Sequence, residues 1–205
     1  MPQDTEQRPI VNISGEHVAL GPARRDLVPA MQRWINDFAT LRTIGAVLPG
    51  PTSLEAEERF HASVTAPNAP PFFIIYERAT WRAIGTTAFH DVDHRNRTAT
   101  FGILIGETDA RGEGYGTEAT RLMLDYAFTA LGLHSVLLTV AEHNHAGRRA
   151  YAKAGFRECG RRRQCRLLAG RLYDDVYMDC LATEFISPVL ARILTPDQPH
   201  SAGVP

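Results

Sequence analysis

The spacing of apolar residues divides the chain into strand-like and helix-like segments. Alternating apolar and polar positions predict strands, whereas apolar positions at i, i+3, i+4 and i+7 predict amphipathic helices. Strands are predicted at residues 17–21, 72–76, 83–90, 98–105, 135–140, 157–168 and 171–181. Helices are predicted at residues 24–38, 52–63, 119–127 and 144–154. This order predicts an α/β (α+β) fold with one mixed, mostly antiparallel sheet, in a single domain of residues 15–183.

Both ends of the chain lack this periodicity. Residues 1–14 are polar and are predicted to form a flexible N-terminus. Residues 184–205 hold four prolines and are interpreted as a tail, either a docked strip or a disordered end. Neither end is expected to form a further domain.

Composition narrows the classes of protein to consider. The chain has 205 residues, of which 44% are hydrophobic and 22% charged, as in ordinary globular proteins. Its 22 basic and 23 acidic residues weaken the case for a nucleic-acid or anionic-membrane partner. No apolar run approaches the roughly 20 residues that span a bilayer, and no secretory signal is visible. Since three cysteines form no disulfide framework, we expect a cytoplasmic protein.

The most informative segment is FGILIGETDARGEGYGT, at residues 101–117, which reads as strand, glycine loop and helix start. Glycines let the backbone turn its N–H groups inward, and a helix N-terminus adds partial positive charge. Such a segment is typical of an anion site suited to a pyrophosphate. A structural turn with spare glycines is the alternative.

Two common nucleotide motifs do not fit this loop. A P-loop needs Gly-Lys-Ser/Thr after its second glycine, which is absent here. A Rossmann fingerprint needs a third glycine where Thr117 stands, and it belongs at a first βαβ unit. This loop instead follows several antiparallel-looking strands, so both motifs are rejected.

Three motifs together resemble a known family. Arg111-x-x-Gly114-x-Gly116 resembles the Q/R-x-x-G-x-G/A signature of the GNAT superfamily of acyl-CoA N-acyltransferases. The strings DHRNR at 93–97 and NHAGRRAYAKAGF at 144–156 are similar to the D-W-R-N-R and N-x-A-S-x-R-x-Y-x-K-x-G-F patterns of its RimJ/RimL-like branch. The resemblance covers residues 15–183. It departs from the pattern at His94 and Gly147, where the branch has a frequent Trp and a usual Ser.

The resemblance implies a GNAT fold whose central strands splay apart, flanked by helices, with acetyl-CoA as the co-substrate. Main-chain groups of one splayed strand would pair with the pantetheine amides as an added strand does, and one N–H could polarise the thioester carbonyl. The glycine loop would hold the pyrophosphate. The implied cofactor-binding residues are Ile103, Leu104, Ile105, Arg111, Gly112, Glu113, Gly114, Tyr115, Gly116, Thr117, Asn144 and Arg149.

The same resemblance implies an acetyl-CoA-dependent N-acetyltransferase in which a primary amine attacks directly in a ternary complex. Tyr151 would protonate the departing CoA thiolate as general acid, with a packed core aromatic as the alternative reading. A base must remove the proton of an ammonium nucleophile before attack. His90, Glu142 and His143 are candidates near the expected cleft mouth, and a water relay would also serve. The base stays open.

The acceptor also stays open at this point. It is either a protein N-terminal amine or a small-molecule amine, and Trp34, Trp81 and residues 36–52 are expected to shape its side of the site. A non-catalytic acyl-CoA-binding sensor is the alternative function. No metal is expected, because His90 and His94 would lie roughly 13 Å apart on an extended strand. The sequence is compatible with a homodimer and leaves the oligomeric state undecided.

Overall fold

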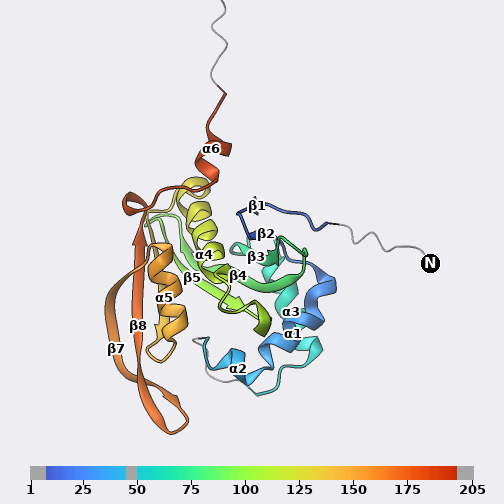
Figure 1. Cartoon of the computed structure of the whole chain (residues 1–205), viewed down its shortest axis with the longest axis vertical. Helices are drawn as coiled ribbons and strands as arrows, with labels where there is room; N and C mark the ends of the chain where they lie inside the picture. The colour runs from blue at the N-terminus through green and yellow to red at the C-terminus, as the bar shows by residue number, and fades with distance from the viewer. Residues whose placement is uncertain (1–7, 45–49, 198–205) are drawn as a thin grey trace, which may run out of the picture.

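The structure, a computed structural model, describes residues 8–44 and 50–197 (Figure 1). Eight strands form one sheet in the order β1-β2-β3-β4-β5-β6-β8-β7. The strands are β1 (Ile13–Ser14), β2 (Val18–Pro22), β3 (Phe72–Glu77), β4 (Ala83–Asp93), β5 (Thr98–Ile105), β6 (Ser135–Ala141), β7 (Arg157–Leu168) and β8 (Arg171–Leu181). The α-helices are α1 (Val28–Ile35), α2 (Phe38–Leu41), α3 (Leu54–Val64), α4 (Tyr115–Asp125), α5 (His145–Ala154) and α6 (Leu190–Leu194). In this part of the chain no helix has the length and apolarity that a membrane crossing requires.

The sheet is antiparallel except where β5 meets β6. These two strands run parallel and pair only from Thr98 opposite Ser135 to Thr100 opposite Leu137. Beyond this point β5 continues to Ile105, paired with β4 on its other side alone. The strands therefore splay apart, and the predicted fold class is confirmed: one mixed, mostly antiparallel sheet with splayed central strands and flanking helices.

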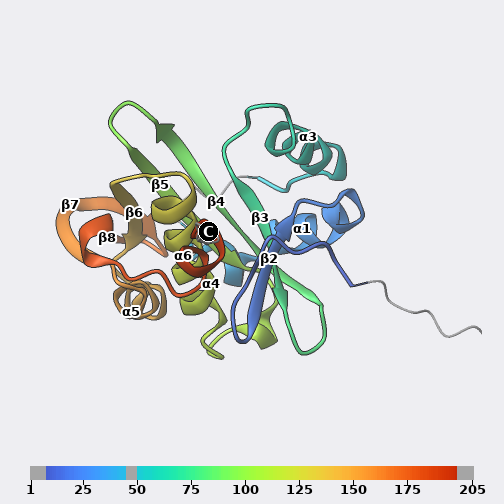
Figure 2. The ribbon, with the colours of Figure 1, turned by 90° about the horizontal axis from the view of Figure 1, so that it is seen from above.

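Helices cover both faces of the sheet (Figure 2). Side chains of a strand point alternately to its two faces, and β3 shows this clearly. Phe73 and Ile75 pack into the large core with α4, whereas Ile74 and Tyr76 pack against Met31 and Trp34 of α1. The helices α1 and α3 thus lie on one face, and α4 lies on the other, next to α5.

The sequence placed most elements correctly, with one clear error. The prediction of a single helix over residues 24–38 is wrong, because α1 ends at Ile35 and the Asp37 side chain caps a separate helix, α2. Asp37 accepts hydrogen bonds from the amides of Ala39 and Thr40, which fixes this new start. The helix predicted over residues 52–63 begins instead at Leu54, with Ser53 as its cap.

The described part of the C-terminal tail contacts the core. The buried carboxylate of Asp125, at the end of α4, accepts hydrogen bonds from the amides of Val189 and Leu190 at 2.9 and 2.8 Å. Leu190 itself is 6% exposed. A domain boundary at residue 183 stays a prediction, and the docked tail residues extend beyond it.

Candidate functional site

Two cavities adjoin one another where β5 and β6 separate. The first, of about 320 Å³, is lined mainly by the end of β5, the glycine loop and α5, and is called here the glycine-loop cavity. The second, of about 390 Å³, is lined by β4, β5, Phe60 of α3 and Phe72 of β3, and is called the aromatic cavity. The residues that line both are Thr43, Ile44, Ile103, Leu104 and Tyr151.

The glycine loop presents backbone N–H groups to the first cavity. Gly112 and Gly114 both have φ of 88°, a left-handed conformation that side chains other than glycine rarely adopt. Gly114 caps α4, an eleven-residue helix. The amides of residues 112–116 donate no hydrogen bond to any described residue. Unpaired amides at a helix N-terminus are typical of an anion site, and the binding of a pyrophosphate here stays a prediction.

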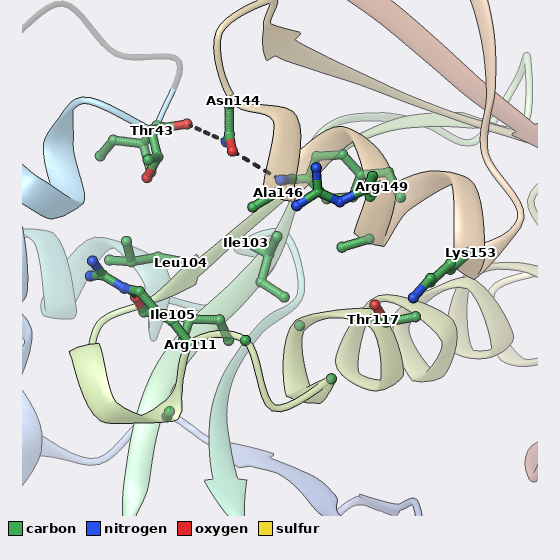
Figure 3. A pocket seen from close by; sticks show the side chains of 18 residues that line it. Thr43, Ile103, Leu104, Ile105, Arg111, Thr117, Asn144, Ala146, Arg149 and Lys153 are labelled. Atoms are coloured by element: carbon green, nitrogen blue, oxygen red, sulfur yellow. Dashed lines mark hydrogen bonds between the residues drawn. The ribbon is translucent and has the colours of Figure 1, made fainter.

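Two cations of α5 add positive charge to the same cavity. Arg149 and Lys153 are four residues apart, which places them on one face of the helix. Both line the glycine-loop cavity, and Figure 3 shows Lys153 extending toward Thr117 of α4. Neither forms an ion pair with a described residue. Backbone amides on one side and two free cations on the other fit a phosphorylated ligand. Lys153 was not among the residues that the sequence singled out as binding.

Arg111 lines the glycine-loop cavity, and its guanidinium is hydrogen-bonded to the protein. It donates hydrogen bonds to the carbonyls of Ile105 at 3.0 Å and Gly106 at 3.2 Å, and to Oγ1 of Thr40 at 2.5 Å. These bonds tie the end of β5 to α2. The predicted contact of this side chain with a pyrophosphate stays a prediction; Figure 3 shows Arg111 beside Ile105 at the end of β5.

The start of α5 fastens the chain that follows α2. Asn144 accepts a hydrogen bond from the Gly147 amide and donates one to the Thr43 carbonyl at 3.1 Å (Figure 3). Nε2 of His143 lies 2.9 Å from the carbonyl oxygen of Arg42. A Cβ at position 147 would lie 2.7 Å from Nδ2 of Asn144, so glycine there leaves room for the cap. Sequence reasoning included Thr43 only within the segment 36–52 and did not single it out, because no motif marks it.

Tyr151 lies at the junction of the two cavities. Its ring packs edge-on against Phe101 and Phe156, with centroids 6.3 and 6.1 Å away. Burial raises the pKa of Tyr151 to about 12, and its hydroxyl makes no hydrogen bond to a described residue. The phenol therefore stays protonated at neutral pH and is available as a hydrogen-bond donor.

The three candidate bases do not lie together. His90 lines the aromatic cavity, which Tyr151 also lines. Glu142 lines neither cavity; it pairs with Arg161 at 3.4 Å and accepts a hydrogen bond from the Asp174 amide. His143 also lines neither, and its ring packs on Tyr173 at 4.9 Å between centroids. Geometry therefore favours His90 among the three.

The acceptor-side expectations are met only in part. Trp34 and Trp81 line neither cavity, and Trp34 is buried against Glu107, to which its indole donates a hydrogen bond at 2.9 Å. Thr43 and Ile44, within the expected segment 36–52, line both cavities, whereas residues 45–49 lie outside the described part of the chain. Among the described residues, no three His, Cys, Asp or Glu side chains are placed to hold a metal.

Comparison with known proteins gives consistent results. A family model described as an acetyltransferase (GNAT) domain matches residues 17–157. Spermidine N(1)-acetyltransferase of Vibrio cholerae is 29% identical over 133 residues, 65% of this chain and 75% of that protein. Human alpha/beta-tubulin-N-acetyltransferase 9 is 26% identical over 156 residues, 70% of this chain and 74% of that protein.

Solved structures show the same fold. The crystal structure of spermidine N-acetyltransferase from Vibrio cholerae in complex with CoA and spermine matches with a TM-score of 0.74. That match covers 82% of this chain and 97% of the other, at 24% sequence identity. Identity at this level supports the shared fold and leaves the ligands of this chain to its own site geometry.

Proposed function

The chain belongs to the GNAT acetyltransferase family, and on that premise we propose that it transfers the acetyl group of acetyl-CoA to a primary amine by direct attack in a ternary complex. The observation that carries this proposal is the meeting of two cavities at Tyr151, one suited to a phosphorylated ligand and the other free to hold an acceptor. The motifs at 93–97 and 144–156 support our assignment of the chain to the RimJ/RimL-like branch.

The glycine-loop cavity would hold the CoA moiety. Amides of residues 112–116, with Arg149 and Lys153, supply the positive side of a pyrophosphate site. Residues 103–105 of β5 have no partner strand on the β6 side, so their main chain is available to pair with the pantetheine amides. Bound acetyl-CoA supplies an activated acyl thioester, and a structure of a relative was solved in complex with CoA.

The reaction forms a C–N bond between the amine and the carbonyl carbon and breaks the C–S bond. A main-chain N–H of β5 stabilises the negative charge that develops on the carbonyl oxygen. Tyr151 donates its hydroxyl proton toward the departing sulfur. Since a thiol has a pKa near 8.5, well below the value of about 12 for Tyr151, complete transfer is uphill unless the phenol regains a proton from the amine nitrogen. We therefore assign Tyr151 a donor role coupled to amine deprotonation.

His90 is assigned the role of accepting the surplus proton of the amine. It is the one candidate base of the three that lines the aromatic cavity. A neutral amine is required for attack, and a positioned histidine or a histidine-bound water removes the proton. Glu142 and His143 make contacts elsewhere in the fold. Glu142 pairs with Arg161, and His143 contacts the carbonyl of Arg42 and the ring of Tyr173.

Thiol release in the presence of an amine panel tests the proposal. The panel contains alkyl monoamines, diamines, spermidine and a short peptide with a free N-terminus, and mass spectrometry identifies the acetylated product. We expect release of one free CoA thiol per acetylated amine. Tight acyl-CoA binding without thiol release for every amine would instead support a non-catalytic acyl-CoA sensor on the same fold.

A further inference from the structure

The side chains that line the aromatic cavity are mostly uncharged. Threonines, aromatic rings and aliphatic side chains supply most of it. Among the described residues that line it, none is Asp or Glu. The described lining therefore offers no carboxylate to pair with a positively charged acceptor.

Acidic side chains elsewhere near the site are already engaged or lie outside the lining. Glu107 pairs with Arg33 and accepts the indole N–H of Trp34. Glu142 pairs with Arg161. Glu57, on the same helix as Phe60, is 6% exposed and does not line the cavity.

Such a lining discriminates between acceptors by charge. A second ammonium placed against this lining finds no carboxylate partner and gives up part of its water shell, which is unfavourable. An apolar group, by contrast, gains from burial against Phe60, Phe72 and Phe101. The first two rings already pack edge-on at 5.8 Å between centroids, so they form a preformed apolar wall.

The same environment helps the reactive nitrogen. Removal from water disfavours the charged form of an amine and lowers its pKa. A larger share of the bound amine is then neutral and able to attack. The cavity therefore favours a single amine that loses its charge on binding.

We propose, as an extension that rests on the proposed function, that the acceptor is a primary amine carried on an uncharged, largely apolar group, such as an alkyl or arylalkyl amine, and that polyamines are poor acceptors. This specificity differs from that of the relatives named as spermidine acetyltransferases.

A matched pair of acceptors tests the proposal with the full chain. Pentylamine and 1,5-diaminopentane have the same length, and one carries a methyl group where the other carries a second ammonium. With acetyl-CoA saturating, we expect kcat/KM to be at least about tenfold higher for pentylamine, the size of one lost charge-assisted interaction. Phenethylamine should behave like pentylamine, and spermidine like the diamine.

The outcomes separate the two proposals. Faster reaction of the diamine and of spermidine would overturn the acceptor assignment and leave the transferase standing. Release of no thiol with any amine, despite acetyl-CoA binding, would overturn the proposed function and the acceptor assignment together.

Introducing a carboxylate provides an independent test. Thr86, half-buried on β4, and Thr139, exposed on β6, both line the aromatic cavity. Thr86→Asp should raise the ratio of diamine to monoamine kcat/KM by about tenfold or more. The matched control Thr86→Asn adds nearly the same volume without charge, so its ratio should stay that of the parent.

Thr139 provides a second test position in case the Thr86 variants do not fold. Thr139→Asp and Thr139→Asn form the same matched pair at a more exposed site. Circular dichroism and acetyl-CoA binding identify the variants that fold. An unchanged ratio in folded Asp variants at both positions would show that the acceptor's distal end lies elsewhere and would overturn the proposal.

Discussion

The two cavities share five lining residues but differ in the chemical groups that dominate the rest of each lining. The glycine-loop cavity depends on main-chain amides at a helix N-terminus, supported by two cations one helical turn apart. The aromatic cavity depends on side chains contributed by α3, β3, β4, β5 and β6. The first arrangement can stay constant in any protein that binds the same nucleotide, because backbone chemistry is shared. The second can change with single substitutions, so under the proposed function it is the place where we expect acceptor specificity to be set.

Tyr151 belongs to both cavities, so its replacement should produce the largest effect. Tyr151→Phe keeps the ring that packs on Phe101 and Phe156 and removes the hydroxyl. We expect turnover to fall about 10²–10⁴-fold, the usual range for general acid catalysis, with acetyl-CoA affinity unchanged. Steady-state kinetics and calorimetry measure the two quantities.

The pH dependence sharpens this experiment. Because the pKa of Tyr151 is raised to about 12, its ionisation lies above the range between about pH 6 and pH 10. The loss in Tyr151→Phe should therefore be the same factor across that range. A loss of less than about tenfold would mean that the tyrosine only packs at the junction.

Gly114→Val should damage the glycine-loop cavity alone. A left-handed φ costs a residue with a Cβ about 1–2 kcal/mol, so the loop relaxes and its amides lose their common direction. We expect acetyl-CoA affinity to fall roughly 10- to 100-fold. At saturating acetyl-CoA the preference between amines should stay unchanged, since the aromatic cavity is intact.

A second glycine supplies the control for backbone strain. Gly132 has φ of 63°, has no atom within 4 Å of a Cβ, and lines neither cavity. Gly132→Val should lower thermal stability without weakening acetyl-CoA binding. Equal losses of affinity in both variants would mean that strain, rather than the anion site, explains the result at Gly114.

The same contrast explains what the sequence could predict. Glycines at 112, 114 and 116 mark the anion loop because few other residues tolerate its backbone. The bounds of β5, β7 and β8 also followed from periodicity and turn residues. Phe60, Thr86 and Thr139, however, come from three separate elements and meet only after folding. The predicted first helix is interrupted at Asp37. The side chain of Asp37 caps α2 through local hydrogen bonds, which the spacing of apolar residues does not reveal.

Charge removal on α5 should produce a smaller effect on the glycine-loop cavity. Arg149→Gln and Lys153→Gln each remove one exposed cation, and we expect about three- to tenfold weaker acetyl-CoA binding at low salt. The loss should shrink as salt is added, because exposed charges are screened. Arg163→Gln, an exposed arginine of β7 outside both cavities, is the control and should leave affinity unchanged. Calorimetry at two ionic strengths measures the acetyl-CoA affinities. An equal change of affinity in all three variants would contradict the assignment of Arg149 and Lys153 to the anion site.

Glu57→Gln should produce the smallest effect. It tests whether the Glu57 carboxylate contributes charge to the acceptor side of the site. Burial raises the pKa of the Glu57 carboxyl, which makes no hydrogen bond to a described residue. Below about pH 4 the carboxyl is protonated in both the folded and the unfolded chain. As pH rises, Glu57 ionises at a lower pH in the unfolded chain than in the folded chain. The free energy of unfolding therefore falls as pH rises through the folded pKa.

Glutamine cannot ionise, so the stability of Glu57→Gln relative to the parent should improve between pH 4 and pH 7, by up to about 1 kcal/mol. Urea unfolding at the two pH values measures this change, and an equal difference at both would show that Glu57 ionises normally. The preference for pentylamine over 1,5-diaminopentane should be unaffected, because Glu57 does not line the aromatic cavity. Loss of diamine acetylation in this variant would instead identify Glu57 as a partner for the second ammonium, and the two sides of the site would then differ less in charge than their linings indicate.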